Sequence, residues 1–205
     1  MNKNILTFDK WATLGKDEGM ERGHHASVAH MLNIIFKCYE KINQKYSAID
    51  FGCGNGWVVR KLKEHSLCKD AHGLDGAKSM IKKAQKYDPK GTYFNEDINI
   101  WAPSQKYDVV FSMETLYYFK NPGKIINTIY DDVLTENGML IIGIDHYAEN
   151  KDSLNWGDKF NLDITTLSIE TWLSLFESAG FKKNNFQQVE GKESWAGTLI
   201  IAANK

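Results

Sequence analysis

Short apolar runs alternate with amphipathic stretches along most of the chain, and this alternation predicts repeated strand–helix units. Residues 47–51 are mostly apolar and short, as expected for a buried strand. From Trp57 onward, the apolar residues Val58, Val59 and Leu62 recur at a helical spacing instead. A strand followed at once by a helix is the unit from which parallel sheets are built.

The same alternation continues to the end of the chain. Further strands are predicted at 72–75, 92–95, 107–113 and 139–144, and helices at 28–42, 77–88, 121–133 and 168–180. Residues 185–190 and 198–202 are the last two strands, which a glycine-containing turn joins as an antiparallel hairpin. The order predicts an α/β fold with a doubly wound, mostly parallel seven-stranded sheet, an antiparallel last strand and helices on both faces.

Two segments lack both kinds of periodicity. Residues 1–25 are polar and carry three glycines, with an aromatic cluster at Phe8 and Trp11, so an irregular segment is expected there. Residues 146–166 are also polar and aperiodic, which is typical of a long surface loop. These two segments are therefore candidates for parts that act around a site rather than within the core.

The composition indicates one compact domain and argues against a polyanionic partner. The chain has 205 residues, of which 42% are hydrophobic, and this is enough for one substantial core. Lysine and arginine number 25 against 26 aspartates and glutamates, so the formal net charge is −1. Without a field of a single sign, nucleic acid is not an expected partner.

Cysteine and histidine usage narrows the compartment and the cofactors. The cysteines Cys38, Cys53 and Cys68 contain no Cys-x-x-Cys pair, and no cleavable apolar segment opens the sequence, so a reduced cytoplasmic setting is expected. No apolar run approaches the roughly 20 residues that a membrane helix requires, so no membrane association is expected. His24 and His25 are adjacent rather than four residues apart, and no metal site is predicted.

The candidate chemistry centres on the junction between strand 47–51 and the helix that follows it. Residues 48–56 read Ala-Ile-Asp-Phe-Gly-Cys-Gly-Asn-Gly, and Asp75 ends the next apolar run, 19 positions after Gly56. Glycines at such a junction let the backbone turn sharply and approach a ligand closely. An acid at the end of the next strand can accept hydrogen bonds from both ribose hydroxyls. The pair predicts an adenosine-containing cofactor.

The glycine spacing decides between two kinds of nucleotide. A dinucleotide fingerprint has the form Gly-x-Gly-x-x-Gly and places a helix N-terminus against a pyrophosphate. Here the glycines fall at 52, 54 and 56, and residue 57 is Trp. The form Asp-x-Gly-x-Gly-x-Gly, from Asp50 to Gly56, resembles the first motif of class I (Rossmann-like) S-adenosylmethionine-dependent methyltransferases. The resemblance covers about residues 28–205.

The resemblance implies S-adenosylmethionine as the cofactor. This molecule has a sulfonium, an amino acid head, a ribose diol and an adenine but no phosphate, so its pocket needs close backbone approach and an acid. By resemblance, Asp50 orients the loop and the methionine amino group, Asp97 bonds the adenine amino group, and Met113 is a backbone contact. A solvated strand end at Asp50, and an ordinary loop acid at Glu96 or Asp97, are the alternatives. The implied cofactor-binding residues are Asp50, Gly52, Cys53, Gly54, Gly56, Asp75, Gly76, Asp97, Ile98 and Met113.

The acceptor side is defined less sharply. Glu114 occupies the position where the family carries an acid, while Tyr117 and Tyr118 are either core residues or a substrate wall. His146 and Tyr147 follow strand 139–144, at the end where parallel sheets bind ligands, and are therefore candidate catalytic residues that orient the acceptor or move a proton. A simply solvated histidine is the alternative. The chain has no Asn-Pro-Pro-Tyr segment of the kind associated with nucleobase or glutamine methylation, which favours a small-molecule methyl acceptor.

These observations predict an enzyme with a single methyltransferase domain over residues 1–205, which moves a methyl group in line from S-adenosylmethionine to a small molecule. The resemblance implies a lid at residues 1–27, for which a frayed terminus is the alternative. Residues 146–166 are the expected substrate loop. An NAD(P)-dependent oxidoreductase is one rival, opposed by Trp57 in place of a third fingerprint glycine. A noncatalytic cofactor-binding module is the other. The acceptor atom, the use of a general base, the pathway and the oligomeric state are left open.

Overall fold

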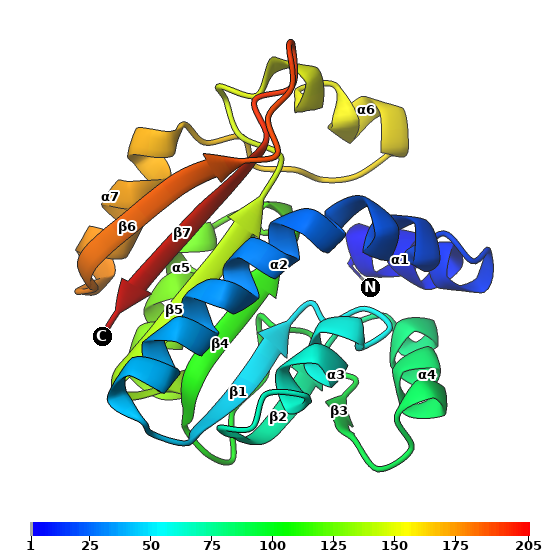
Figure 1. The fold of residues 1–205 in the computed structure, drawn as a ribbon. Helices are drawn as coiled ribbons and strands as arrows, with labels where there is room; N and C mark the ends of the chain where they lie inside the picture. The colour runs from blue at the N-terminus through cyan, green and yellow to red at the C-terminus, as the bar shows by residue number, and fades with distance from the viewer. Residues whose placement is uncertain (1) are drawn as a thin grey trace. The chain divides into compact units, whose positions relative to one another are not determined.

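The seven predicted strands form one sheet. The computed structural model describes residues 2–205, apart from the Lys183 side chain, and gives the strand order β3-β2-β1-β4-β5-β7-β6. The predicted fold class is confirmed, because β1 and β3 pair in parallel with β2, β4 pairs in parallel with β5, and β7 runs antiparallel to both of its neighbours (Figure 1). The chain divides into two compact units, Met1–Ala102 and Pro103–Lys205.

The first unit contains three parallel strands and four helices. Its elements are α1 (Lys3–Thr13), α2 (Asp17–Ile42), β1 (Tyr46–Phe51), α3 (Trp57–Lys63), β2 (Cys68–Leu74), α4 (Lys78–Tyr87) and β3 (Thr92–Phe94). β2 pairs in parallel with both β1 and β3. α3 packs on β1 and β2, and α4 packs on β3 and on α1 (Figure 1). The carboxyl ends of β1 and β2 therefore lie side by side, which places the glycine loop next to Asp75.

The expectation of an irregular segment over residues 1–25 is wrong, because α1 and the first turns of α2 occupy it. The Asn2 side chain caps α1 by accepting a hydrogen bond from the N–H of Asn4 at 2.9 Å. Ile5, Phe8 and Ala12 then fall on one face of that helix, and Ala12 is buried. A glycine inside a helix costs about 0.5–1 kcal/mol relative to alanine, and Gly19 and Gly23 lie inside α2, while Gly15 lies in the turn between the two helices. Tertiary packing of the apolar face outweighs that cost.

The second unit contains the other four strands. Its elements are β4 (Tyr107–Met113), the 3₁₀ turn η1 (Leu116–Tyr118), α5 (Pro122–Thr128), the π turn η2 (Ile129–Val133), β5 (Leu134–Ile144), the 3₁₀ turn η3 (Lys151–Ser153), α6 (Trp156–Phe160), α7 (Ile169–Ala179), β6 (Lys182–Val189) and β7 (Thr198–Asn204). β4 and β5 are parallel, and β7 lies between β5 and β6. The segment between β5 and α7 holds only η3 and α6, in agreement with its lack of periodicity.

Helix ends in the second unit follow the local signals in the sequence. Asn121 caps α5 by accepting from the N–H of Lys124 at 3.1 Å, and Pro122 opens the helix. Ser168 caps α7 by accepting from the N–H of Thr171 at 3.1 Å. Gly180 ends α7 at φ 99°, in the left-handed region that favours glycine. These predicted boundaries are confirmed.

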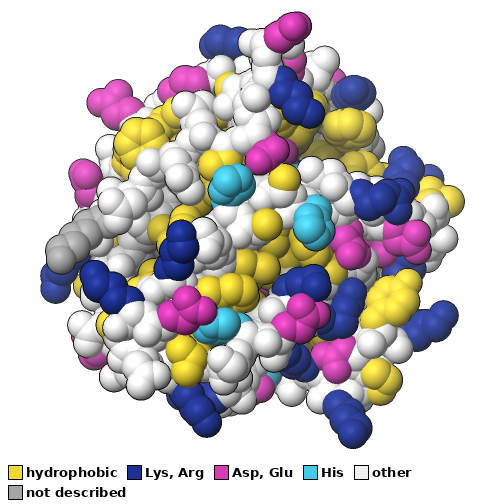
Figure 2. Space-filling view, viewed as in Figure 1, with side chains coloured by type: hydrophobic (Ala, Val, Ile, Leu, Met, Phe, Trp, Pro, Cys, Tyr) yellow, Lys and Arg dark blue, Asp and Glu magenta, His cyan; other side chains and the backbone are white. Residues whose placement is uncertain are grey.

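Charged side chains of both signs are mixed on one face of the molecule (Figure 2). Figure 2 shows lysines and arginines interspersed with aspartates and glutamates over the face in view. Among the described residues, helices of the length and apolar character needed to cross a bilayer are absent.

Candidate functional site

The glycine loop joins β1 to α3 through three residues with positive φ. Gly52, Gly54 and Gly56 have φ values of 78°, 52° and 76°, which residues with side chains rarely adopt. The N–H groups of Gly52 and Cys53 donate to the carbonyl oxygen of Leu74 at 2.8 and 3.1 Å. The loop is thereby tied to the end of β2, as the predicted junction requires.

The second and third glycines serve different purposes. A Cβ at Gly56 would lie 2.6 Å from a ring carbon of Tyr93 and 2.9 Å from the Cβ of Ala84, so this glycine lets the loop pack on β3 and α4. A Cβ at Gly54 would meet only the Met80 sulfur, at 3.9 Å. The backbone at Gly54 is therefore bare and has open space beside it. Such a surface allows a ligand to approach the main chain directly.

Asp75 lies directly after β2 and faces the glycine loop. Its Oδ2 accepts a hydrogen bond from the N–H of Gly54 at 2.9 Å, and its Oδ1 accepts one from the N–H of Ala77 at 2.7 Å. Burial raises the pKa of Asp75, and the bonds from Ala77 and Gly54 oppose that rise. The predicted pair of glycine loop and acid is thus brought together by the bond from Gly54, while the bond from Ala77 fixes the orientation of the carboxylate.

A second carboxyl group lies beneath the loop. Asp50 is 2% exposed at the end of β1, and burial followed by the nearby Asp75 carboxylate raises its pKa well above the usual range. Its burial excludes the solvated strand end that was the alternative for this residue. The Asp75 carboxylate repels an anion and attracts a cation, and Asp50 adds to this effect when a bound cation favours its ionised form. This charge pattern suits a phosphate-free cationic ligand and does not suit a pyrophosphate.

Cys53 contributes its backbone rather than its thiol. The side chain is 3% exposed, and burial raises the pKa of the thiol well above its usual range. The thiol is therefore inert, and its N–H is already bonded to β2. Cys53 holds the loop in place, and direct contact with a cofactor stays a prediction.

The loop after β3 approaches Asp75 through a residue that the sequence reasoning missed. The Asn95 side chain donates to the carbonyl oxygens of Asp75 and Gly76 at 3.1 and 3.0 Å. Asp97 accepts hydrogen bonds at its Oδ1 from the N–H and the side chain of Asn99, at 2.9 and 2.8 Å. Ile98 is half-buried in the same loop. Adenine contacts by Asp97 and Ile98 remain predictions.

The N-terminal helices are bonded to this region, which the sequence reasoning also missed. Asn55 donates to Asp17 Oδ2 at 3.1 Å and to Glu21 at 3.2 Å. Lys83 in α4 forms an ion pair with Asp17 at 2.6 Å. Asp9 caps α4 by accepting from the N–H of Ser79 at 2.6 Å. These pairs are 34 to 70 positions apart in sequence, so no local pattern marks them.

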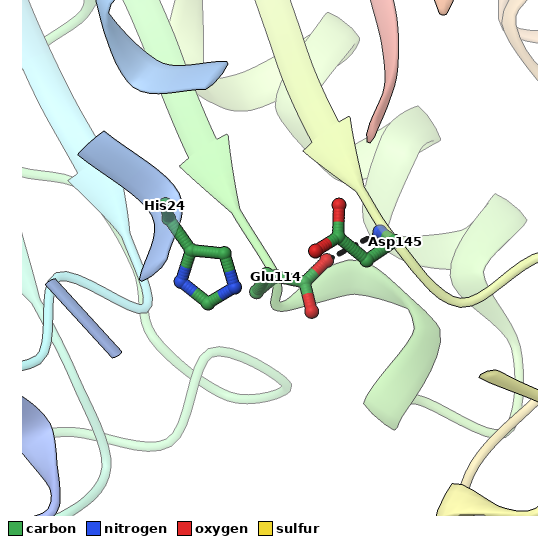
Figure 3. A group of neighbouring side chains, drawn as sticks. All are labelled: His24, Glu114 and Asp145. Carbon is green, nitrogen blue, oxygen red and sulfur yellow. Dashed lines mark hydrogen bonds between the residues drawn. The ribbon is translucent and has the colours of Figure 1, made fainter. Parts of the chain in front are cut away.

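In the second unit, the end of β4 holds a strained residue. Glu114 follows Met113, the last residue of β4, and has φ 55°, which is uncommon for a residue with a side chain. Its carboxylate accepts a hydrogen bond from the N–H of Asp145 (Figure 3). It accepts a second one, at 2.6 Å, from the hydroxyl of Tyr117. Glu114 therefore ties the end of β4 to the end of β5. A cofactor contact at Met113 stays a prediction.

The two candidate catalytic residues are both buried and bonded. His146 is 1% exposed, with Nδ1 3.0 Å from the carbonyl oxygen of Ser153 and Nε2 2.7 Å from the hydroxyl of Thr166. Because a carbonyl can only accept, Nδ1 carries the proton and Nε2 accepts from Thr166 in the neutral ring. Burial lowers the pKa of His146, although the bond to Ser153 opposes this. The solvated histidine that was the alternative is excluded.

Tyr147 is fixed in the same way. Its hydroxyl donates to the carbonyl oxygen of Gly197 at 3.0 Å and accepts from the Gln188 side chain at 2.8 Å, and the residue is fully buried. Burial raises the pKa of Tyr147. In this arrangement His146 and Tyr147 hold the segment after β5 in place, and their catalytic roles stay predictions.

A pocket opens beside His146. Its volume is about 460 Å³, a size that suits a small molecule. It is lined by Tyr118, Lys120, His146, Leu154, Gly157, Asp158, Leu162, Asp163, Ile164, Thr165 and Thr166. Most of these residues belong to the segment 146–166. The sequence reasoning identified that segment but had no signal for its inward-facing members.

Comparison with known proteins agrees with this geometry. The profile of the family described as "Methyltransferase domain" matches residues 23–184. The malonyl-[acyl-carrier protein] O-methyltransferase 2 of Ilyobacter polytropus is 25% identical over 161 residues, which are 75% of this chain and 56% of that protein. The trans-aconitate 2-methyltransferase of Rhizobium etli is also 25% identical, over 76% of this chain and 57% of its own length. The chain thus spans little more than half the length of these relatives.

A solved structure shows the same fold over nearly the whole chain. It comes from the complex titled as that "between the Haloferax volcanii Trm112 methyltransferase activator and the putative methyltransferase". The TM-score is 0.82 at 22% identity, and the match covers 96% of each chain.

Proposed function

The chain belongs to the methyltransferase domain family, whose cofactor is S-adenosylmethionine, and from that premise we propose that it methylates a small molecule. The observation that carries the proposal is the contact between the bare backbone of Gly54 and the Asp75 carboxylate, 2.9 Å apart. It combines in one place the close approach and the acid that a phosphate-free nucleoside needs.

The residues of the first unit fit this cofactor. Each Asp75 oxygen accepts one backbone N–H, and a carboxylate has about four lone-pair sites, so both oxygens can still accept a ribose hydroxyl. Asp50 is a buried carboxyl group whose ionised form, favoured by a nearby cation, would attract the cationic part of the ligand. S-adenosylmethionine, when bound, supplies a methyl group that its sulfonium has already activated. The protein then has mainly to position the reactants, which can contribute about 7–11 kcal/mol.

The pocket beside His146 is the proposed acceptor site. In it, Tyr118 and the two threonines 165 and 166 offer hydroxyl groups, and Lys120 offers a cation. The relatives are named for malonyl-[acyl-carrier protein] and trans-aconitate, which both carry carboxyl groups. Small carboxylic acids are therefore the first acceptors to assay, followed by amines.

His146 and Tyr147 are proposed to orient the acceptor rather than to be required as bases. The neutral His146 ring has one acceptor nitrogen, and Thr166 occupies it at 2.7 Å. An acceptor that displaced Thr166 would gain this base, which matters for a hydroxyl and not for an amine or a carboxylate. The segment 146–166 would act as the substrate loop of a single domain.

Residues 1–27 are proposed as a lid of that domain. The supporting contacts are those of Asn55 with Asp17 and Glu21, which bond α2 to the glycine loop. A cytoplasmic location is likewise proposed, supported by three cysteines that are all free thiols.

Two measurements test the proposed function. Thermal shifts with S-adenosylmethionine, S-adenosylhomocysteine and NAD separate a methyltransferase from an oxidoreductase, because the first two should stabilise the chain and NAD should not. Radiolabelled methyl transfer into a metabolite extract then separates an enzyme from a noncatalytic module. Stabilisation by NAD alone would refute the proposal. Binding of the cofactor without methyl transfer to any extract component would favour the noncatalytic module.

A further inference from the structure

The backbone conformation of Gly76, the residue after Asp75, does not require a glycine. It is absent from the positive-φ residues of the described chain, so any amino acid could adopt its conformation. The reason is a neighbour. A Cβ at Gly76 would lie 2.6 Å from Cδ1 and 2.9 Å from Cγ1 of Ile5. The Ile5 side chain therefore occupies the space that a side chain at position 76 would fill.

The packing of α1 against α4 holds Ile5 in that place. α1 packs on α4, where Asp9 accepts from the N–H of Ser79 at 2.6 Å. Further along α1, Ala12 is buried in a cluster with Ala77 and Met80. Ile5 is itself only half-buried, so part of its side chain is available to a ligand. Its neighbour Leu6 is 51% exposed.

Ile5 lies where the base of a nucleoside bound at Asp75 would be expected. β2 lies between β1 and β3, so Asp75 has the glycine loop on one side and the loop after β3 on the other. Asn95 bonds that second loop to the backbone of Asp75 and Gly76. If the ribose hydroxyls bond to Asp75 and the charged head lies over the glycine loop, the base extends toward the side of Gly76. A flat base needs an apolar surface there.

We propose that Ile5 is a cofactor-binding residue, which supplies from α1 the apolar wall for the adenine base that position 76 lacks. This inference rests on the proposed function, because it assumes an adenine nucleoside at Asp75. It assigns a binding role to a residue far from the glycine motif in sequence. It also explains why Gly76 and Ile5 occur together: a larger residue at either position would displace the other.

The affinity for S-adenosylhomocysteine, measured by titration calorimetry, tests the proposal. Ile5→Ala should weaken binding about 5- to 20-fold, as expected from the loss of part of a buried apolar contact. Leu6→Ala removes a similar side chain from the same helix at an exposed position, and it should change affinity less than 2-fold. Adenosine should lose affinity by the same factor as the full ligand in Ile5→Ala, because the base is common to both.

The double variant Ile5→Ala/Gly76→Val gives the sharpest test. Removing Ile5 opens the space beside position 76, so valine there should restore at least half of the lost affinity on a logarithmic scale. Because valine could also restore the packing of α1, the free energy of unfolding of each variant is measured in urea beside its affinity. Affinities that only follow the stability, or a double variant without recovery, would overturn the role of Ile5. If Ile5→Ala is too unstable to titrate, Ile5→Val and Leu6→Val replace the pair, with an expected loss of about 2- to 3-fold for the first alone.

The outcomes separate this inference from the function on which it rests. A wild-type chain that binds no S-adenosylhomocysteine contradicts both. Wild-type binding with an unchanged Ile5→Ala affinity, or equal losses in Ile5→Ala and Leu6→Ala, overturns the role of Ile5 and leaves the proposed function standing.

Discussion

The glycine loop and the pocket beside His146 are fixed by different kinds of contact. At the loop, three glycines and one acid lie within 24 residues of each other, and the decisive bond joins Gly54 to Asp75. Beside His146, side chains distant in sequence set the geometry, such as Tyr147 with Gly197 and Glu114 with Asp145. The comparison teaches that the cofactor side can be read from a local motif, while the acceptor side is defined only by the folded chain.

Replacing Gly56 or Gly54 by alanine should have different effects, the first mainly on stability and the second mainly on cofactor binding. Gly56→Ala forces a Cβ against Tyr93 and Ala84 at positive φ, and it should lower the free energy of unfolding by about 2–4 kcal/mol. Gly54→Ala has open space, so it should cost only about 1–2 kcal/mol of backbone strain while weakening cofactor binding at least 10-fold. Urea denaturation and calorimetry measure the two effects, and equal stability losses would contradict the distinction.

Removing the Glu114 carboxylate should loosen the acceptor side alone. Glu114→Ala loses the bonds from Asp145 and Tyr117 and keeps the φ of 55°, so unfolding should become easier by about 2–3 kcal/mol. Glu114→Gly loses the same bonds but relieves the strain, and should be about 1 kcal/mol more stable than Glu114→Ala. A glycine variant less stable than the alanine variant in urea would show that the strain is absent.

Thr166→Val should release one end of the segment 146–166. It removes the hydroxyl that bonds His146 at 2.7 Å, with an expected stability loss of about 1 kcal/mol and no change in affinity for S-adenosylhomocysteine. Steady-state kinetics should show a raised KM for the acceptor with an unchanged KM for the cofactor. Parallel changes in both constants would mean that the segment does not belong to the acceptor site alone.

The pH dependence of stability should reveal the buried His146. Its pKa is lowered by burial, so the folded protein binds this proton less readily than the unfolded chain. The stability due to neutral His146 is therefore present above the unfolded pKa and is lost as the pH falls below that value toward the folded pKa. His146→Gln should show a smaller loss of stability than the wild type between pH 7 and 5, and an identical loss would argue against burial of the neutral ring.

Asp50 should change the stability with pH in the direction opposite to His146, and it should also make cofactor binding depend on pH. Burial and then Asp75 raise its pKa, so the stability due to its protonated form is lost as the pH rises through that folded pKa. The ionised form is the one that attracts a cation. The affinity for S-adenosylmethionine should therefore increase with pH, and Asp50→Asn should flatten the increase. A titration series that keeps its slope in the variant would remove Asp50 from the charge balance.

Local signals were enough for much of the fold. The strand Tyr107–Met113 and the caps at Asn121 and Ser168 were predicted correctly, because continuous apolar runs and capping side chains act over a few residues. The helices before residue 25 were missed, since Gly19 and Gly23 weaken the local helix preference of α2 and α1 depends on its packing against α4. That packing is a tertiary effect which no short window contains.

The candidate site could likewise be predicted only where its contacts are local in sequence. Asp75 and the glycine loop were found from spacing, whereas Asn55, Asn95 and Ile5 were not, because each acts through a partner at least 19 positions away. His146 was identified by its place after β5, but its burial and its bond to Thr166 depend on how the segment 146–166 folds back.

The most direct test of the account is the affinity of wild type and Asp75→Ala for S-adenosylhomocysteine, measured by calorimetry on chains shown to be folded. The account predicts clear binding by the wild type and a loss of about 30-fold or more in the variant, because two charge-assisted hydrogen bonds to the ribose disappear. Equal affinities would contradict it.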